Sequence, residues 1–377
     1  MNNAMHCNNS HMEGKLMKYK EDIEKTLDNY RSWWNREDFG RCAIAIVAKK
    51  SPTKEDPPVP FPEKVEDRWL DFTYMEAAIH HKLRNHEYIA EALPVFSGGY
   101  PGYDGFGTWN GCEITFGEDT AWIHPIISEG SLTDYDPQDI KVDKNGKWWL
   151  YSNEYHEFLN RCCAGNSLPV VPALGGTGDT LSALRSNIKL LYDLIDTPDV
   201  IKLFEERLMT LWIEAFEHFY QMHKDLSFGG NANWIGMWAP GRFYIPQNDF
   251  SYMISTKMYE EIFLDQLVRQ LDYLEYSIYH LDGVGAFRHI DLLCTLKDLD
   301  AIQVGPGAGK PSPLYYMDIL KKVQAAGKGL HISIAPEEVA YALDNLSSKG
   351  LFINTWTETV EDGYDLLKTV EQNSKFY

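Results

Sequence analysis

The chain has 377 residues, of which 44% are hydrophobic and 13% aromatic, so its length and apolar content suffice for a large folded core. Its 55 acidic residues outnumber 35 basic ones and give a formal net charge of -20, which argues against nucleic acid and anionic membrane surfaces as partners. No apolar run approaches the roughly 20 residues of a membrane span, and we expect a cytoplasmic protein with a small-molecule partner.

The first part of the chain predicts an N-terminal extension, a first strand and an irregular insertion. Residues 1–14 are polar and unpatterned, so we expect a disordered tail followed by a single domain over residues 15–377. A charged amphipathic pattern predicts a helix over residues 15–34, and an apolar run predicts a strand over residues 42–47. Residues 118–149 fit no simple strand-then-helix unit and are interpreted as an insertion.

Further elements follow from apolar spacing in the middle of the chain. Helical periodicity predicts helices at residues 68–93, 154–163, 180–194, 198–223 and 257–273. Apolar runs bounded by glycine predict strands at residues 112–116 and 168–176.

The last third of the chain alternates four strands with four helices. The strands are predicted at residues 277–281, 301–304, 330–334 and 351–355, and the helices that follow them at residues 287–296, 314–326, 336–346 and 360–372. This compact alternation indicates a parallel sheet in which each crossover is one helix. Together with the chain length, it predicts an α/β fold, a (β/α)8 TIM barrel with an N-terminal helical extension and an irregular insertion.

Polar side chains lie at the ends of these four strands, although strands of a buried parallel sheet are usually apolar throughout. His280 and Asp282 end the first strand, Gln303 ends the second, His331 lies in the third and Asn354 ends the fourth. Each one alone is more simply a satisfied polar residue, but four consecutive cases favour a functional site at one barrel mouth. His280 and Asp282 are two residues apart and share a strand face, where they can bind a metal or move a proton.

A loop that precedes this region combines aromatic rings, a cation and a carboxylate. Trp234, Trp238 and Tyr244 offer stacking faces, Arg242 offers a positive charge, and Asp249 lies shortly before a predicted helix. We interpret this segment as binding a substrate that has a flat or apolar part and an anionic part. An aromatic cluster packed under a surface loop is an equal alternative.

With these residues in place, the chain resembles the uroporphyrinogen decarboxylase and cobalamin-dependent methyltransferase superfamily of (β/α)8 barrels, as a divergent member. The resemblance is clearest over residues 249–372. In the methyltransferase members a strand ends in His-x-Cys-Gly and a later strand supplies a second Cys, and this set holds a zinc that activates a thiol. Here His280 matches that His, whereas Asp282 stands at the Cys position and no cysteine follows Cys294.

The resemblance implies a metal-assisted methyltransferase or demethylase that moves a methyl group from a small methylated substrate to a corrinoid protein or a thiol. It implies zinc held by His280, Asp282 and His331, a harder and more Lewis-acidic set than one with thiolates. The corrinoid-binding signature is absent, so a corrinoid would come only with a separate partner protein. The predicted catalytic residues are Asp249, Asp282 and His280. The predicted substrate-binding residues are Trp234, Trp238, Arg242, Tyr244, Gln303 and Asn354.

Two alternatives stay open beside this hypothesis. The resemblance also covers metal-free decarboxylases, in which Asp249 or Asp282 would protonate a carbanion while Arg242 or Arg185 holds a carboxylate. The Arg-rich N-terminal motif of those enzymes is absent from residues 31–41. The second alternative is a barrel that binds a small ligand without catalysis, which the missing Cys ligand motivates.

Overall fold

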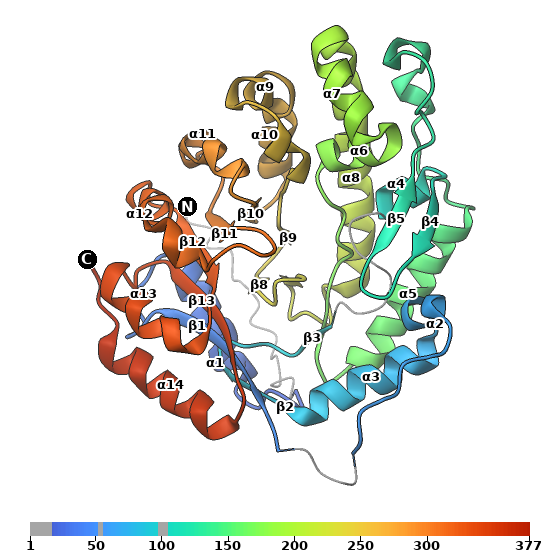
Figure 1. Ribbon diagram of the computed structural model, residues 1–377. Helices are drawn as coiled ribbons and strands as arrows, with labels where there is room; N and C mark the ends of the chain where they lie inside the picture. The colour runs from blue at the N-terminus through green and yellow to red at the C-terminus, as the bar shows by residue number, and fades with distance from the viewer. Residues whose placement is uncertain (1–16, 52–55, 97–104) are drawn as a thin grey trace, which may run out of the picture.

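The computed structural model describes residues 17–51, 56–96 and 105–377, and Figure 1 shows its helices arranged around a curved central sheet. The strands are β1 Ala43–Lys49, β2 His86–Ala90, β3 Val95–Phe96, β4 Glu113–Phe116, β5 Ala121–His124, β6 Leu168–Pro169, β7 Asn231–Ala232, β8 Trp238–Ala239, β9 Phe243–Tyr244, β10 Tyr276–Asp282, β11 Ala301–Gly305, β12 Gly329–Ser333 and β13 Leu351–Thr357. The predicted tail over residues 1–14 lies outside the described residues.

Helices precede the first strand, connect many of the later strands and follow the last strand (Figure 1). They are α1 Ile23–Trp34, α2 Val65–Leu70, α3 Phe72–Asn85, α4 Gly105–Trp109, α5 Lys147–Cys163, α6 Thr177–Arg185, α7 Asn187–Asp196, α8 Pro198–His223, α9 Thr256–Ile262, α10 Leu264–Tyr273, α11 Ile290–Thr295, α12 Met317–Ala325, α13 Val339–Asn345 and α14 Val360–Asn373. Among the described residues, no helix is both long and apolar enough to cross a membrane.

The main sheet has seven strands in the order β2-β1-β13-β12-β11-β10-β9. All neighbours from β1 to β9 run parallel, and β2 pairs antiparallel with β1. The predicted α/β class and the four strand-helix units of the last third are therefore confirmed. The pairings among the described residues do not join the two edges, β2 and β9, so closure into an eight-stranded barrel stays a prediction.

Both faces of the sheet are buried, but in two separate apolar clusters. One face, which includes Ile44, Leu281 and Ile353, packs against the surrounding helices. The opposite, inner face carries Ile278, Ala301 and Phe352 and belongs to the second cluster. Because parallel strands with both faces covered read as near-continuous apolar runs, this burial explains why the strands were visible in the sequence.

Helix α1 closes the inner face from the amino ends of the strands. Its Tyr30, Trp33 and Trp34 are buried in the same cluster as Phe352. The Trp34 indole donates a hydrogen bond of 3.0 Å to the Trp238 carbonyl, and the Tyr30 hydroxyl donates one of 2.9 Å to the Glu91 carbonyl. The predicted N-terminal helix is thus present from residue 23 and forms a floor beneath the inner face.

One predicted helix, over residues 68–93, differs from the structure. Helices α2 and α3 occupy its first part, but residues 86–90 form strand β2 along the free edge of β1. The buried Lys20 ammonium donates to the carbonyls of Tyr88 and Ala90 and covers the outer side of that strand. Edge pairing and a lysine that satisfies the edge outweigh local helical spacing here.

Two other predicted helices are each divided. Ser186 has a φ of 81° and separates α6 from α7, and Phe263 separates α9 from α10. The predicted insertion over residues 118–149 holds strand β5 of the β4–β5 hairpin, two short 3-10 turns and the start of α5. The β4–β5 hairpin and α5 lie on the side of the molecule opposite α12 to α14 (Figure 1).

Candidate functional site at the carboxyl ends of the strands

The inner face of the sheet changes from apolar to polar along the strands. His280 of β10 is in register with Gln303 of β11, which is in register with His331 of β12. The next row toward the carboxyl ends contains Asp282 on β10 and the register pair Ser333 and Asn354. The four polar strand ends singled out in the sequence therefore lie on one face at one end of the sheet.

His280 is held by its neighbour on the adjacent strand. Its Nδ1 lies 2.6 Å from the side-chain oxygen of Gln303, which fixes that nitrogen as the donor and leaves Nε2 as the acceptor. The ring meets Trp234 edge to face, with centroids 5.0 Å apart. Burial lowers the pKa of His280, while the Gln303 bond and Asp282 oppose that shift. The imidazole is therefore neutral and oriented.

Asp282 and Asp249 approach each other at the strand ends. Asp282 needs the glycine at position 305, because a Cβ there would lie 2.9 Å from its carboxylate oxygen. Asp249 opens a short 3-10 turn that follows β9, and Asn248 caps this turn. The negative charge of Asp282 raises the pKa of Asp249, after the larger effect of partial burial. Asp249 remains exposed at the mouth, so solvent reaches it.

A third carboxyl, Asp179, comes from the first turn of α6. It accepts a hydrogen bond of 2.9 Å from the Phe250 amide and one of 3.3 Å from the Gly176 amide. The loop ending at Asp249 packs very close to this turn, since a Cβ at position 176 would lie 1.9 Å from the Gln247 carbonyl oxygen. This close approach brings Asp179 beside Asp249.

The Asp179–Asp249 pair retains a proton near neutral pH. Burial, and after it the charge of the neighbouring Asp249, raise the pKa of Asp179 to about 7. Hydrogen bonds from backbone amides favour the charged form and oppose this shift. Burial and Asp282 raise the pKa of Asp249 to about 6. Two like charges in one site cannot both form cheaply, so the two carboxyls titrate as a unit. Such a pair serves as a proton donor and acceptor.

Glu205 of α8 lies behind this pair and is fully buried. The Thr177 hydroxyl donates to one of its oxygens, and the other oxygen has no partner among the described residues. Burial raises the pKa of Glu205 to about 8, with Asp179 adding to the shift. Glu205 is therefore neutral at physiological pH and supplies no counter-charge to Asp179.

The three metal ligands expected from the resemblance do not converge. Gln303 stands between His280 and His331 in the register, and the fully buried His331 ring stacks on Phe352. Burial lowers the pKa of His331 to about 3. Within the described ranges, no group of three or more His, Cys, Asp or Glu side chains is arranged to hold a metal ion. The side chains as they stand therefore do not fit a zinc site.

The predicted substrate-binding residues separate into two groups. Trp234 and Asn354 line a cavity of about 640 Å3 at the mouth. Trp238 is fully buried near the α1 floor, where its indole donates a 2.8 Å hydrogen bond to the Ser227 carbonyl. The Tyr244 hydroxyl is buried and accepts from the Leu174 amide. These last two side chains have no access to the mouth.

Arg242 also lies away from the mouth. It precedes β9 at the amino end of the sheet, contacts Glu275 at 3.5 Å and packs its guanidinium over the Tyr273 ring. The loop from Trp234 to Tyr244 runs from the mouth down to the floor, because a turn from Asn233 to Met237 reverses the chain between the two tryptophans. The expected stacking platform of Trp234, Trp238, Tyr244 and Arg242 is therefore not assembled.

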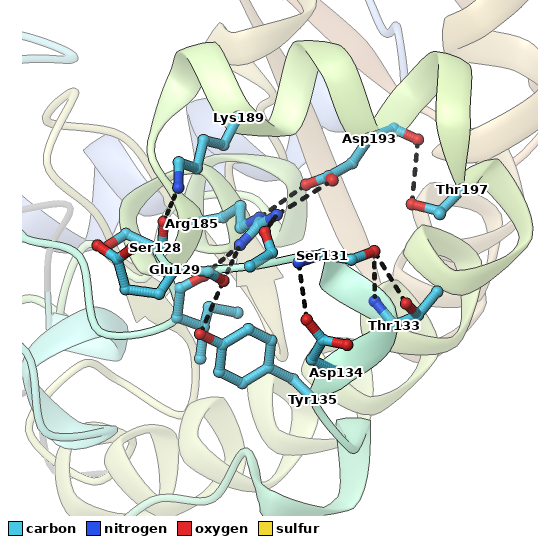
Figure 2. A network of polar contacts seen from close by, with 12 residues as sticks. Ser128, Glu129, Ser131, Thr133, Asp134, Tyr135, Arg185, Lys189, Asp193 and Thr197 are labelled. Atoms are coloured by element: carbon cyan, nitrogen blue, oxygen red, sulfur yellow. Dashed lines mark hydrogen bonds and ion pairs between the residues drawn. The ribbon is translucent and has the colours of Figure 1, made fainter.

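Arg185, the other expected carboxylate holder, is occupied within the protein (Figure 2). Its guanidinium makes two hydrogen bonds to Asp193, at 2.7 and 3.2 Å. The remaining donors reach the carbonyls of Ile127, Glu129 and Gly130. All five N–H groups are used, and the side chain is 3% exposed, so none is left for a substrate.

Sequence reasoning missed Asp179 and Glu205 as members of the site. Asp179 follows a glycine-rich turn at residues 175–178. Its meaning depends on contact with a loop far along the chain. Glu205 carried no signal, because a glutamate in the amphipathic pattern of α8 reads as a solvated residue.

Comparisons with known proteins bear on the fold. No protein-family model matches this chain, and no curated protein sequence matches it. One solved structure that it resembles is a methyltransferase from Methanosarcina mazei, with a TM-score of 0.58 and 11% sequence identity. The match covers 92% of this chain and 98% of that one. At this identity the likeness shows the fold alone, and membership of the superfamily stays a prediction.

Proposed function

We propose that the protein is a methyltransferase-like enzyme that removes a methyl group from a small methylated substrate, with the Asp179–Asp249 pair as its general acid. The observation that carries this proposal is the carboxyl pair whose pKa values are raised to about 7 and about 6. It lies beside the oriented, neutral imidazole of His280. The fold likeness to a structure named a methyltransferase supports the reaction class.

The chemistry needs a proton at the leaving atom. A nucleophilic acceptor attacks the methyl carbon, and its electron pair forms the new bond while the bond from carbon to the substrate heteroatom breaks. The electron pair of the broken bond then takes the proton of Asp249 and gives a neutral leaving group. Because Asp249 is exposed at the mouth, water can restore its proton after each turnover.

The acceptor in this proposal is a thiol or a corrinoid that a separate partner protein brings. Zinc held by His280, Asp282 and His331 stays a prediction. Since these side chains do not converge, no step is assigned to a metal. The role that this chain supplies is proton delivery by Asp249, tuned by Asp179 and Asp282.

Decarboxylation is the second candidate, and the same carboxyl pair favours it. In that reaction the bond between the substrate and its carboxylate breaks, carbon dioxide leaves, and the electron pair left on carbon takes the proton from Asp249. The two reactions use one acid but differ in product.

A labelled-substrate experiment tests both. The protein is incubated with a panel of trideuteromethyl ethers, thioethers and amines, with a thiol or a reduced corrinoid as acceptor, and the products are identified by mass spectrometry. A panel of aromatic and aliphatic acids is assayed in parallel for released carbon dioxide. We expect labelled methyl on the acceptor, with loss of about a hundredfold or more in rate for Asp249→Asn.

Asp199→Asn is the matched control, because Asp199 is 95% exposed on α8 and should leave the rate unchanged. Carbon dioxide release without methyl transfer would favour the second candidate. Equal rates for wild type and Asp249→Asn would refute the role of the carboxyl pair in either reaction. Turnover of no substrate in either panel would leave the ligand-binding alternative as the better account.

A further inference from the structure

The cavity at the mouth has an unusual combination of charge and apolar surface. Its walls come from β1, α3, the β2–β3 segment, the Trp234 turn and the carboxyl ends of β12 and β13. Apolar side chains dominate, and the aromatic members are Trp234, Trp356, Phe96 and Tyr88. Lys82 is the one charged side chain among the described lining residues. No carboxylate lines the cavity in that part of the chain, although the protein carries a net charge of -20.

Lys82 has no ion-pair partner among the described residues, unlike two other basic residues, one on α3 and one that follows β1. Arg84, one half-turn further, pairs with Asp56 at 2.7 Å, and Lys50 near the end of β1 pairs with Glu87 at 2.9 Å. Burial by the surrounding walls lowers the pKa of the Lys82 ammonium, although the side chain stays accessible to solvent. A positive charge held against apolar walls without a counter-ion is the arrangement that an anionic ligand completes.

We propose that this cavity binds a small carboxylate with a flat apolar body, its carboxylate on the Lys82 ammonium and its body between Trp234 and Trp356. Trp234 also meets the His280 ring edge to face, and the proposal places the far end of such a ligand on that side of the cavity, toward the acid pair. Ser333, at the carboxyl end of β12, offers a hydrogen bond to a polar substituent, while the Asn354 amide nitrogen beside it already donates to the Ile235 carbonyl. The inference rests on the proposed function for this orientation, but its test measures binding and not turnover.

The test compares charged and neutral probes of the same shape. Phenylacetate, 3-phenylpropionate and 4-phenylbutyrate are titrated against the full-length protein by calorimetry, and each is compared with its neutral amide. We expect at least one carboxylate to bind about tenfold or more tightly than its amide. Lys82→Met should remove that preference without weakening the amide, and Lys82→Arg should keep it.

Two further variants separate this inference from the proposed function. Lys368→Met on α14, where Lys368 pairs with Asp365, should bind as wild type. Asp249→Asn should also bind as wild type, so loss of turnover and loss of binding are distinguished. The inference is overturned if wild type binds no carboxylate of the panel, if acid and amide bind equally, or if Lys82→Met retains the preference.

Discussion

The two ends of α6 carry ionisable side chains with different partners: an ion pair at the carboxyl end and a second carboxyl at the amino end. At the carboxyl end, Arg185 and Asp193 pair at 2.7 Å, and every remaining donor of the guanidinium meets a carbonyl (Figure 2). At the amino end, Asp179 meets a second carboxyl, Asp249, and no Lys or Arg of the described residues lies within ion-pair distance of it. The contrast lies in the partners, since both ends of the helix are largely buried.

This contrast separates structure from chemistry within one helix. A buried ion pair with all its hydrogen bonds satisfied holds segments together, and here Arg185 ties the insertion to α6 and α7 (Figure 2). Two carboxyls that share a site keep a proton at neutral pH, and clusters of this kind mark functional sites. The insertion-side network is therefore expected to govern folding, and the mouth-side pair is expected to govern reactivity.

The largest effect is expected from Arg185→Met. Removing the guanidinium leaves the Asp193 carboxylate, 9% exposed, without its cation, which costs about 3–5 kcal/mol. Urea denaturation should show this loss as a lower midpoint. Lys322→Met, which removes an exposed pair with Asp291, is the control and should change stability by less than about 1 kcal/mol. Equal effects of the two variants would contradict a structural role for Arg185.

Asp249→Asn is expected to lower the reaction rate without lowering the folding stability, the reverse of Arg185→Met. This variant removes a like charge from the mouth and leaves folding stability at pH 8 unchanged or slightly higher. It should nevertheless lower the rate of methyl transfer by about a hundredfold or more. The measurements are the urea midpoint and the turnover rate on one preparation. A large loss of stability together with the loss of rate would place Asp249 with Arg185 as a structural residue.

The pH dependence of stability is expected to come partly from Glu205. Its pKa is raised to about 8 in the folded protein from an ordinary value of 4.5. Its stabilising contribution is therefore complete below pH 4.5 and is lost as the pH rises through 8. Glu205→Gln should be about 1–3 kcal/mol more stable relative to wild type at pH 8 than at pH 5. Urea titrations at the two pH values that give the same difference would contradict this.

The buried histidine pair of α5 and α8 is expected to lower the folding stability at acid pH, whereas Glu205 lowers it at alkaline pH. His156 Nδ1 lies 2.8 Å from His223 Nε2, and burial lowers the pKa of both rings, that of His223 to about 3. The stability they contribute is present above pH 6.5 and is lost as the pH falls toward 3. We expect the free energy of unfolding of His156→Phe to fall less than that of wild type as the pH is lowered below 6.5. The expected difference is about 1 kcal/mol near pH 5, the smallest effect of the series, and urea titration measures it.

The sequence predicted the fold best where each strand is apolar on both faces, as in β10 to β13. The polar residues that interrupt these runs, His280 and Gln303 among them, marked the mouth correctly, because parallel strands align their carboxyl ends. The positions of the aromatic side chains in the loop from Trp234 to Tyr244 were harder to predict. Trp234 and Trp238 are four residues apart yet lie at opposite levels of the inner face, and only the intervening turn decides this.

The role of Asp179 could not be predicted from the local sequence pattern. Its position in the first turn of α6 indicates only a capping role, and it does accept the Gly176 amide. Its raised pKa depends on Asp249, which follows a different strand and reaches it only because glycine at position 176 permits close packing. Charges brought together by tertiary contact leave no periodic signature in the chain.

The most direct measurement of the central claim is an infrared titration of protonated carboxyl groups, taken as the difference between wild type and Asp249→Asn. The account predicts that wild type keeps a protonated carboxyl that the variant lacks, and that this signal disappears as the pH rises through about 6 to 7. A difference signal that is already absent at pH 5 would show that both carboxyls are ionised together, and it would contradict the shared proton on which the proposed chemistry rests.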